Sequence, residues 1–506
     1  MTAKVKTFSF VGIDVAAIDV QVKISPGLPS FAIVGLPDKA VGESKERVRA
    51  AIMSTGLSWP FQRITVNLAP ADLQKEGSHF DLAIALGLMI EIGVLEQNLL
   101  EDFFVLGELS LDGAINAVGG IISAAIGANE RKNGIICPKE NGAEAAWAGD
   151  LPIIAAPNLL TLINHLKSEQ ILERPKISRL AEAKNYPDLS DVKGQENAKR
   201  ALEIAAAGGH NLLMVGPPGT GKSMLASRLP GILPPLELLE ILEVSMVQSI
   251  SGKISDGKLS AIRPFREVHH SASMPAMVGG GAKIKPGEVS LAHNGVLFLD
   301  ELAEFPSQVL DSLRQPLETG EVSIARVNSH VTYPANFQLV AAMNPCRCGF
   351  LGDAKRECKK APSCGDDYKN KISGPLLDRI DIVINVGQVD YFSEKNLAKS
   401  ENSKAVAARV FKARELQKKR YEAEDEMKNR PKINAKIDGK ILEKFCELDD
   451  ESQKILQNAA TKMHSSMRGI TRILRVARTI ADLEAAEKIS TNHLLEAISY
   501  RNPNNA

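Results

Sequence analysis

The chain has 506 residues, which is too long for one hydrophobic core, so we expect roughly two to four domains. Lys plus Arg and Asp plus Glu both number 61, and this balance excludes nucleic-acid binding through a global positive field. No apolar run approaches the roughly 20 residues of a membrane helix, and the N-terminus lacks a signal-peptide core. These features predict a cytoplasmic protein with no membrane partner, whose nucleic-acid contacts, if any, come from local basic patches.

Residues 1–170 are predicted to form a first unit of mixed strands and helices. Apolar residues alternate along its first segments, which is typical of strands with one buried face. Its predicted elements are strands around Phe8 and Val22, a helix over 44–54, a strand over 64–68 and a buried helix over 80–92. The polar stretch 171–187 contains Pro175 and Pro187, which favours a linker.

A phosphate-binding loop follows the apolar strand 211–215 and precedes a helix predicted over 223–229. The residues of the loop are Gly216, Pro217, Pro218, Gly219, Thr220, Gly221, Lys222 and Ser223. In this pattern the glycines let backbone N–H groups surround phosphate oxygens, while the lysine reaches the β- and γ-phosphates and the serine ligates Mg²⁺. The order of strand, loop and helix therefore predicts a site for ATP and Mg²⁺.

Two further apolar strands end in polar side chains. The strand over 295–299 leads to Asp300 and Glu301. We expect Asp300 to hold Mg²⁺ through its water shell and Glu301 to polarise the attacking water. The strand over 338–342 leads to Asn344, whose neutral amide would position that water or sense the γ-phosphate.

Four of the six cysteines lie close together in the sequence: Cys346, Cys348, Cys358 and Cys364. Four thiolates in a short loop can close a tetrahedral zinc site, and such a site suits a reducing compartment better than a disulfide framework does. The spacing departs from the usual paired C-x₂-C knuckles, so free thiols in a lysine-rich loop are the alternative. A zinc ion here would brace the strand that leads to Asn344.

The last third of the chain is expected to be helical. Residues 391–434 carry Lys, Arg and Glu at helical spacing, which favours a solvated helical connector. Residues 435–506 are predicted to form a small domain with four short amphipathic helices.

The order of phosphate loop, Asp-Glu pair, asparagine and later arginines resembles that of the AAA+ ATPases. An arginine suits phosphoryl transfer because its guanidinium is planar, always protonated and bidentate. The resemblance implies that Arg379 acts in trans on a neighbouring subunit's nucleotide. It also implies that Arg472 is a second sensor, a role for which Arg468 and Arg475 compete. An arginine acting in trans requires a ring, and a hexamer is the usual closure.

Other segments narrow the resemblance. Residues 263–270, 285–294 and a hairpin over 315–334 are similar to the magnesium-chelatase-type clade of AAA+ proteins. Residues 27–37 and 67–72 resemble the YifB/ComM family, bacterial proteins with a Lon-like N-terminal domain.

This resemblance implies an α/β fold class with three domains. They are a Lon-like (ribosomal S5 domain 2-like) α+β domain over 1–170, an AAA+ P-loop α/β domain with a parallel sheet over 188–390, and a small helical domain over 435–506. Val192 and Gln195 stand where AAA+ proteins place their adenine-pocket turn.

The family implies a hexameric helicase that drives branch migration of single-stranded and branched DNA in recombination, notably in natural transformation. The candidate DNA contacts in the pore are Lys283, Lys285, Arg326 and His330. Two alternatives stay open: a motor subunit of the magnesium-chelatase type, and an ATP-dependent protein remodeller or protease.

A Lon-like fold invites the hypothesis of a Ser–Lys protease, in which a neutral amine activates a serine. Ser78 or His79 falls where Lon proteases keep the serine. Ile121 and Ile122 stand where the lysine is expected, and an isoleucine cannot accept a proton. We therefore expect the N-terminal domain to be inactive as a protease.

Overall fold

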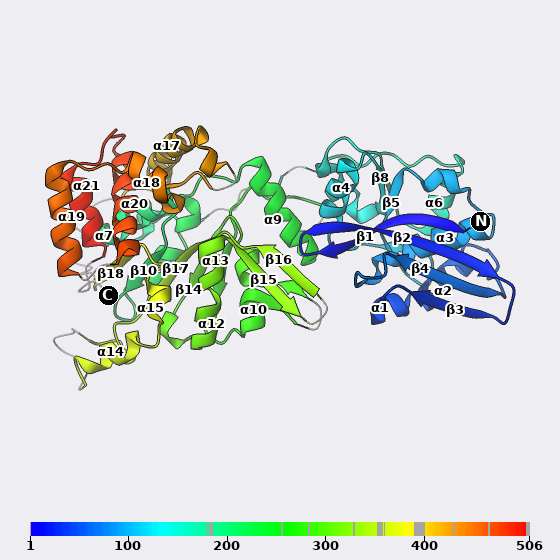
Figure 1. Cartoon of the computed structure of the whole chain (residues 1–506), viewed down its shortest axis with the longest axis horizontal. Coiled ribbons are helices and arrows are strands. Elements are labelled where there is room, and N and C mark those ends of the chain that lie inside the picture. Colours follow the sequence, from blue (N-terminus) through cyan, green and yellow to red (C-terminus); the bar gives the residue numbers. More distant parts are fainter. Residues whose placement is uncertain are drawn as a thin grey trace.

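The computed structural model describes residues 2–178, 180–181, 186–254, 257–281, 284–326, 329–351, 358, 360–388, 400–428, 431–463 and 466–501. The molecule is elongated, with the N-terminal sheet at one end and the C-terminal helices at the other (Figure 1). Within these residues, no helix combines the length and the apolar character that crossing a membrane requires.

A seven-stranded mixed sheet organises the N-terminal part, in the order β3-β4-β2-β1-β5-β8-β9. Its strands are β1 (Ala3–Val11), β2 (Asp14–Ser25), β3 (Ser30–Val34), β4 (Arg63–Ala69), β5 (Phe103–Val105), β8 (Gly134–Pro138) and β9 (Ile153–Ala156). The longer helices are α2 (Ser44–Ser54), α3 (Asp81–Glu91), α4 (Ile121–Glu130) and α6 (Leu159–Leu166). Helix α3 packs on β1 and β2 and is buried along nearly its whole length, which explains its apolar sequence. The strands and the two helices predicted for this part are confirmed.

A second sheet has five parallel strands in the order β11-β14-β17-β10-β18. Its strands are β10 (Leu212–Val215), β11 (Phe265–Val268), β14 (Val296–Leu299), β17 (Gln338–Met343) and β18 (Ile382–Asn385). Its flanking helices are α7 (Glu196–Gly208), α8 (Lys222–Ala226), α9 (Leu238–Ile250), α10 (Met274–Val278), α11 (Glu288–Leu291), α12 (Ser307–Ser312), α13 (Arg314–Thr319), α14 (Ser363–Lys369) and α15 (Gly374–Leu377). The parallel α/β sheet expected for the phosphate-loop unit is confirmed.

The helix after the phosphate loop is shorter than predicted. We expected it over 223–229, but α8 ends at Ala226 and a 3₁₀ turn follows over Leu229–Gly231. The reason is Pro230, because proline has no amide hydrogen and disfavours the helical conformation in the residue before it.

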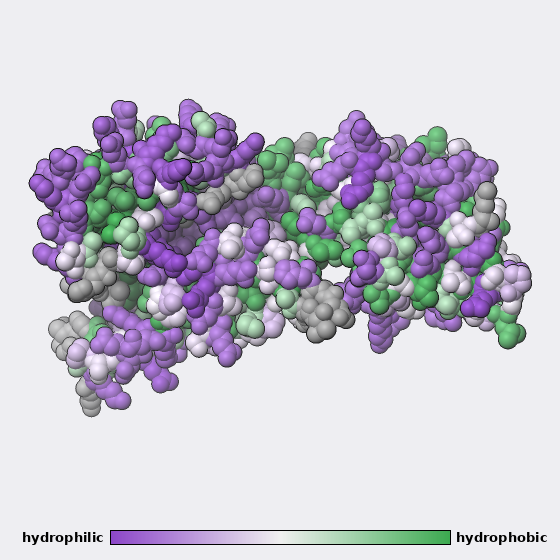
Figure 2. All heavy atoms as spheres, viewed as in Figure 1, coloured by the Kyte–Doolittle hydropathy of each residue, from purple (hydrophilic) through white to green (hydrophobic). Residues whose placement is uncertain are grey.

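Five helices form most of the C-terminal part: α17 (Ser403–Glu422), α18 (Gly439–Phe445), α19 (Asp450–Lys462), α20 (Met467–Leu483) and α21 (Thr491–Ser499). The four helices predicted over 435–500 are confirmed. The helix predicted within 391–434 is present as α17, but it is not solvated on all sides, because one face packs against α7 and α20. Val406, Val410 and Ala413 are buried at helical spacing, while the surface around α17 is largely hydrophilic (Figure 2).

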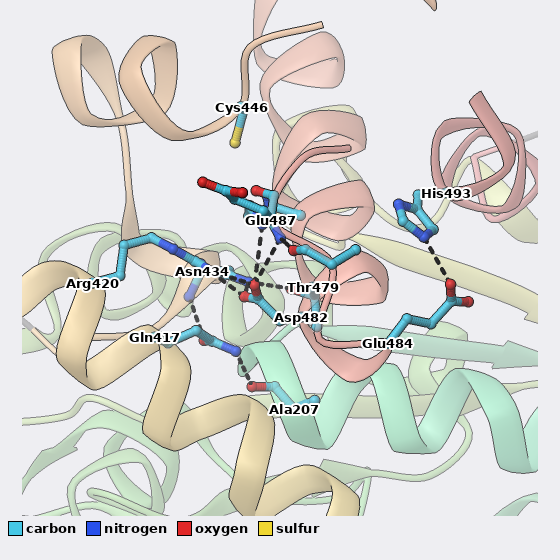
Figure 3. A network of polar contacts seen from close by, with 12 residues as sticks. Ala207, Gln417, Arg420, Asn434, Cys446, Thr479, Asp482, Glu484, Glu487 and His493 are labelled. Carbon is cyan, nitrogen blue, oxygen red and sulfur yellow. Dashed lines mark hydrogen bonds and ion pairs between the residues drawn. The ribbon is translucent and has the colours of Figure 1, made fainter. Parts of the chain in front are cut away.

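Polar contacts also fasten α17 to its neighbours. The amide of Gln417 donates to the carbonyl of Ala207 in α7 at 3.0 Å, and the guanidinium of Arg420 donates to Asp482 of α20 at 2.9 Å (Figure 3). The side chain of Asn434 donates to the same Asp482 carboxylate at 2.8 Å. The C-terminal helices and the connector therefore form one packed body over the five-stranded sheet.

The N-terminal part and the phosphate-loop part of the molecule meet at a small apolar cluster. Helix α9 extends from the phosphate-loop part, which contains the five-stranded sheet, towards α4 of the N-terminal part (Figure 1). The buried members of the cluster are Ile122, Leu236, Ile241, Val244 and Leu259. The hydroxyl of Ser178, within the predicted linker, donates to the carbonyl of Gly257 at 2.6 Å, so the linker also contacts this junction.

Candidate active site

The phosphate loop has the backbone that an anion cradle needs. Gly219 and Gly221 adopt φ values of 79° and 89°, and a Cβ on either would meet nothing within 4 Å. The left-handed conformation favours glycine, and the open space leaves the loop amides accessible. The amine of Lys222 donates to the carbonyls of Gly216 at 2.7 Å and Pro217 at 2.9 Å. It therefore lies within the curve of the loop.

Side chains from three neighbouring strand ends converge on this loop. The hydroxyl of Ser223 donates to the Asp300 carboxylate at 2.5 Å, and the amine of Lys222 donates to the Asn344 amide oxygen at 3.2 Å. Burial lowers the pKa of Lys222, while the charge of Asp300 opposes that shift. A hydroxyl and a carboxylate side by side are the oxygen ligands that Mg²⁺ prefers, so the donor set fits this ion.

Glu301 has a partner that the sequence did not reveal. Its carboxylate lies 3.0 Å from Nδ1 of His270, and its backbone is left-handed at φ 52°. His270 follows β11, the strand beside β14. The signal was the pair His269-His270 directly after the short segment Phe265–Val268, a region that we used only as a sign of resemblance.

The turn predicted to contact the adenine lies beside the phosphate loop. Val192 is buried, and Gln195 precedes α7 in a left-handed conformation with φ 59°. The side-chain amide of Gln195 donates to the carbonyl of Gly387 at 2.7 Å and to that of Thr220 at 3.4 Å. This turn therefore joins the loop after β18 to the phosphate loop.

The two arginines with predicted roles lie in ion pairs within the chain. Arg379 pairs with Glu318 and also donates to the Pro375 carbonyl at 2.6 Å, which leaves 10% of its side chain exposed. Arg472 lies 3.3 Å from Asp381, and burial lowers its pKa although Asp381 opposes the shift. Among the described residues, no hydrogen bond or ion pair joins either arginine to the phosphate loop.

The two competing arginines of α20 differ in their surroundings. Arg468 is exposed and lies 3.9 Å from Glu318, while Nε of Arg475 donates to the Ile437 carbonyl at 2.6 Å. Of these three arginines, Arg472 is the one that pairs with Asp381, the residue directly before β18.

The four clustered cysteines come together in space. The sulfurs of Cys346, Cys348 and Cys358 lie within 4.8 Å of one another, and those of Cys346 and Cys348 are 3.2 Å apart. Cys364, at the start of α14, shares hydrogen bonds with Cys358 and Cys346. The arrangement brings four sulfur ligands into one cluster directly after β17.

The candidate DNA contacts are only partly described. Lys285 is exposed on the short strand β13 (Lys285–Pro286), and His330 is exposed on the hairpin of β15 (Glu321–Arg326) and β16 (Ser329–Pro334). Lys283 and the side chain of Arg326 lie outside the described residues.

The N-terminal residues considered for a protease have other contacts. The hydroxyl of Ser78 donates to the Glu108 carboxylate, and Nε2 of His79 lies 2.9 Å from the Phe8 carbonyl. Ile121 and Ile122 are fully buried at the start of α4. Among the described residues, the hydrogen-bond partner of the Ser78 hydroxyl is therefore an acid and not an amine.

The sequence is similar to known proteins along nearly its whole length. Residues 188–393 match the family model "Magnesium chelatase, subunit ChlI", residues 20–141 match "Subunit ChlI of Mg-chelatase", and residues 400–501 match "Magnesium chelatase, subunit ChlI C-terminal". YifB of Salmonella typhimurium is 44% identical over 99% of this chain and 97% of its own length. Competence protein ComM of Haemophilus influenzae is 44% identical over 97% of this chain and 95% of its own length. The magnesium-chelatase 67 kDa subunit of Heliobacterium mobile is 29% identical over 33% of this chain and 29% of its own length.

Proposed function

Because the chain belongs to the YifB/ComM family of magnesium-chelatase-like AAA+ proteins, we propose that it is an ATP-driven ring motor that acts on DNA. The observation that carries the ATPase part is the convergence of Lys222, Ser223, Asp300 and Asn344 at adjacent strand ends. The DNA part draws support from the relative named a competence protein.

In this proposal each side chain of the site has one task. Lys222 binds the β- and γ-phosphates, Ser223 and Asp300 hold Mg²⁺, and Asn344 positions the attacking water. Mg²⁺, when bound, offsets negative charge on the phosphates. Glu301 accepts the proton of that water, and its position depends on the contact with His270. Val192 and Gln195 line the adenine side.

We place the motor in a ring, because Arg379 can complete a neighbour's site only in such an assembly. A hexamer in the cytoplasm is the assembly that we propose. DNA, single-stranded or branched, would pass along loops that carry Lys283, Lys285, Arg326 and His330. Exchanging Lys285 for Ala is expected to reduce the stimulation of ATP hydrolysis by DNA and to spare the basal rate.

The test is ATP-dependent dissociation of a labelled synthetic four-way DNA junction, with Lys222→Ala as the control. Dissociation by the unmodified protein and none by the variant would support a branch-migration motor. Active ATP hydrolysis in an assembled ring without dissociation would instead favour a chelatase-type or protein-remodelling client. A serine-reactive fluorophosphonate that labels Ser78 would overturn the inactive-protease part of the proposal.

We also propose that Cys346, Cys348, Cys358 and Cys364 bind one zinc ion. Zn–S bonds of about 2.3 Å in a tetrahedron place sulfurs about 3.8 Å apart. The separations among the Cys346, Cys348 and Cys358 sulfurs, from 3.2 Å to within 4.8 Å, bracket that value, and Cys364 hydrogen-bonds to Cys358 and Cys346 as the fourth member. Metal analysis of purified protein should find about one zinc per chain, and a content well below one would reject this site.

A further inference from the structure

The cysteine cluster begins almost at the residue that we assign to the attacking water. Asn344 and Cys346 are separated by a single residue, and Cys346 is fully buried. The Asn344 amide oxygen accepts a hydrogen bond from Lys222. Two peptide units therefore connect Cys346 to Asn344, so the backbone of one restricts the backbone of the other.

The same cluster touches the phosphate loop. Gly349 follows Cys348 and adopts φ 81°, and a Cβ on it would lie 2.6 Å from Cδ of Pro218. Real Cβ atoms do not approach other atoms so closely, so the backbone of Gly349 packs directly on this loop residue. The cysteine segment thus adjoins Asn344 along the chain and contacts Pro218 of the phosphate loop.

A third contact leads to the turn that follows Glu301. Cys364 lies in α14, and Tyr368 of the same helix is buried and hydrogen-bonds to Glu304. The amine of Lys371 lies 3.6 Å from the same carboxylate. Helix α14 therefore links the cysteine cluster to the segment that carries the acidic pair.

From these contacts we infer that the cysteine cluster, with zinc bound, is a positioning element of the ATPase site. The inference rests on the proposed ATPase function and on the proposed zinc site. The described residues between β17 and α14 contain no helix or strand of their own, so metal binding would supply the energy that orders them. Zinc occupancy then sets how well Asn344 and Pro218 are held during hydrolysis.

The first test removes zinc ligands. Cys348→Ser and Cys358→Ser should each lose zinc, and kcat for ATP hydrolysis should fall about tenfold or more, because a small misplacement of positioning groups is costly. The affinity for a fluorescent ATP analogue should change far less, because Lys222 and the loop glycines remain. Cys348→His, which offers another zinc ligand, should retain both zinc and activity. Cys137→Ala and Cys446→Ala are the controls, since both cysteines are buried outside the cluster.

The second test alters the contact between Gly349 and Pro218 and leaves every cysteine in place. Gly349→Ala should keep its zinc and still lower kcat, because the new methyl group pushes on Pro218. Gly93→Ala is a matched control, since Gly93 has φ 78° and a Cβ there would meet nothing within 4 Å. The Gly93→Ala variant introduces a similar backbone strain in the N-terminal part, outside the phosphate-loop site.

The outcomes separate the proposals. Zinc in the unmodified protein, with full ATP hydrolysis in the cysteine variants and in Gly349→Ala, would overturn this inference alone. If the unmodified protein hydrolyses ATP but contains no zinc, the proposed zinc site is rejected, together with the positioning role of zinc. If the unmodified protein hydrolyses no ATP, the proposed function fails, and this inference fails with it.

Discussion

The hydroxyl of Ser249, near the end of α9, donates a hydrogen bond to the buried carboxylate of Glu144 in the N-terminal part. The same hydroxyl accepts a hydrogen bond from the amide of Gly120 at 2.8 Å. Gly120 directly precedes Ile121 and Ile122, the residues at which the resemblance to Lon proteases led us to expect a lysine. The segment at the start of α4 is thus where helix α9 of the phosphate-loop part packs on the N-terminal part.

Helix α9 also reaches the strand that carries the acidic pair. Glu243, in the middle of the helix, accepts from the side-chain amide of Asn294 at 2.8 Å and lies 3.2 Å from Nε2 of His293. These two residues precede β14, whose far end leads to Asp300. One helix therefore contacts both the N-terminal part and the start of the strand that leads to the site.

We expect Ser249→Ala to weaken this junction by about 1–3 kcal/mol, because two buried hydrogen bonds lose their shared partner. The measurement is faster hydrogen exchange at Gly120, whose amide donates to Ser249, and at Ile122, whose amide donates to Glu144. Ser251→Ala is the matched control, since the Ser251 hydroxyl donates to the Val247 carbonyl of α9 and has no other hydrogen bond within the described part of the chain. Equal exchange in the two variants would contradict a role for Ser249 at the junction.

Glu301→Gln should slow ATP hydrolysis by about a hundredfold or more, because an amide cannot accept the proton of the attacking water. ATP binding should persist, since Lys222 and the phosphate loop are unchanged. A filter-binding assay beside a phosphate-release assay distinguishes the two steps. Glu267→Gln serves as the control, because Glu267 is an exposed acid on the neighbouring strand β11. Hydrolysis at the unmodified rate would remove Glu301 from the mechanism.

The role of Arg379 can be tested by mixing subunits. Arg379→Ala and Lys222→Ala should each be inactive, yet an equal mixture should regain about a quarter of the activity if Arg379 acts in trans around a ring. The gain arises where an intact Lys222 site meets an intact Arg379 from its neighbour. No recovery in mixed rings would instead indicate that the pairing with Glu318 inside one chain is the whole function of Arg379.

Because His79 is buried, we expect the free energy of unfolding to decrease in acid. Burial lowers its pKa to about 4, below the ordinary value of 6.5, so the unfolded chain binds the proton more tightly than the folded one. Its contribution is complete above pH 6.5 and is lost as the pH falls towards 4, by up to about 3 kcal/mol.

Chemical denaturation of the chain across this pH range measures the effect. His79→Gln keeps a donor for the Phe8 carbonyl and removes the titration, so its stability should depend less on pH. Exchange of the exposed His330 for Gln is the control and should leave the pH dependence unchanged. A pH dependence that is the same in all three proteins would contradict the assignment to His79.

Much of the candidate nucleotide site was predictable from the sequence, because its residues directly follow strands that can be recognised locally. The apolar strand over 211–215 leads into the phosphate loop, and the strands over 295–299 and 338–342 lead to polar side chains. Adjacent parallel strands bring such ends together. The contacts of Ser223 with Asp300 and of Lys222 with Asn344 follow from that order. The burial of α17 was also present in the sequence, as apolar residues four and three positions apart, but its many charges obscured it.

The sequence by itself determined the strands, the phosphate loop, the acidic pair and the grouping of four cysteines, because each depends on residues close along the chain. Only the tertiary structure decided that His270 meets Glu301, that Gly349 packs on Pro218 and that Ser249 binds Glu144. Such pairs join segments separated by many residues, and no local periodicity encodes them. They are fixed by how whole helices and loops pack, where burial and shape complementarity of many side chains act together.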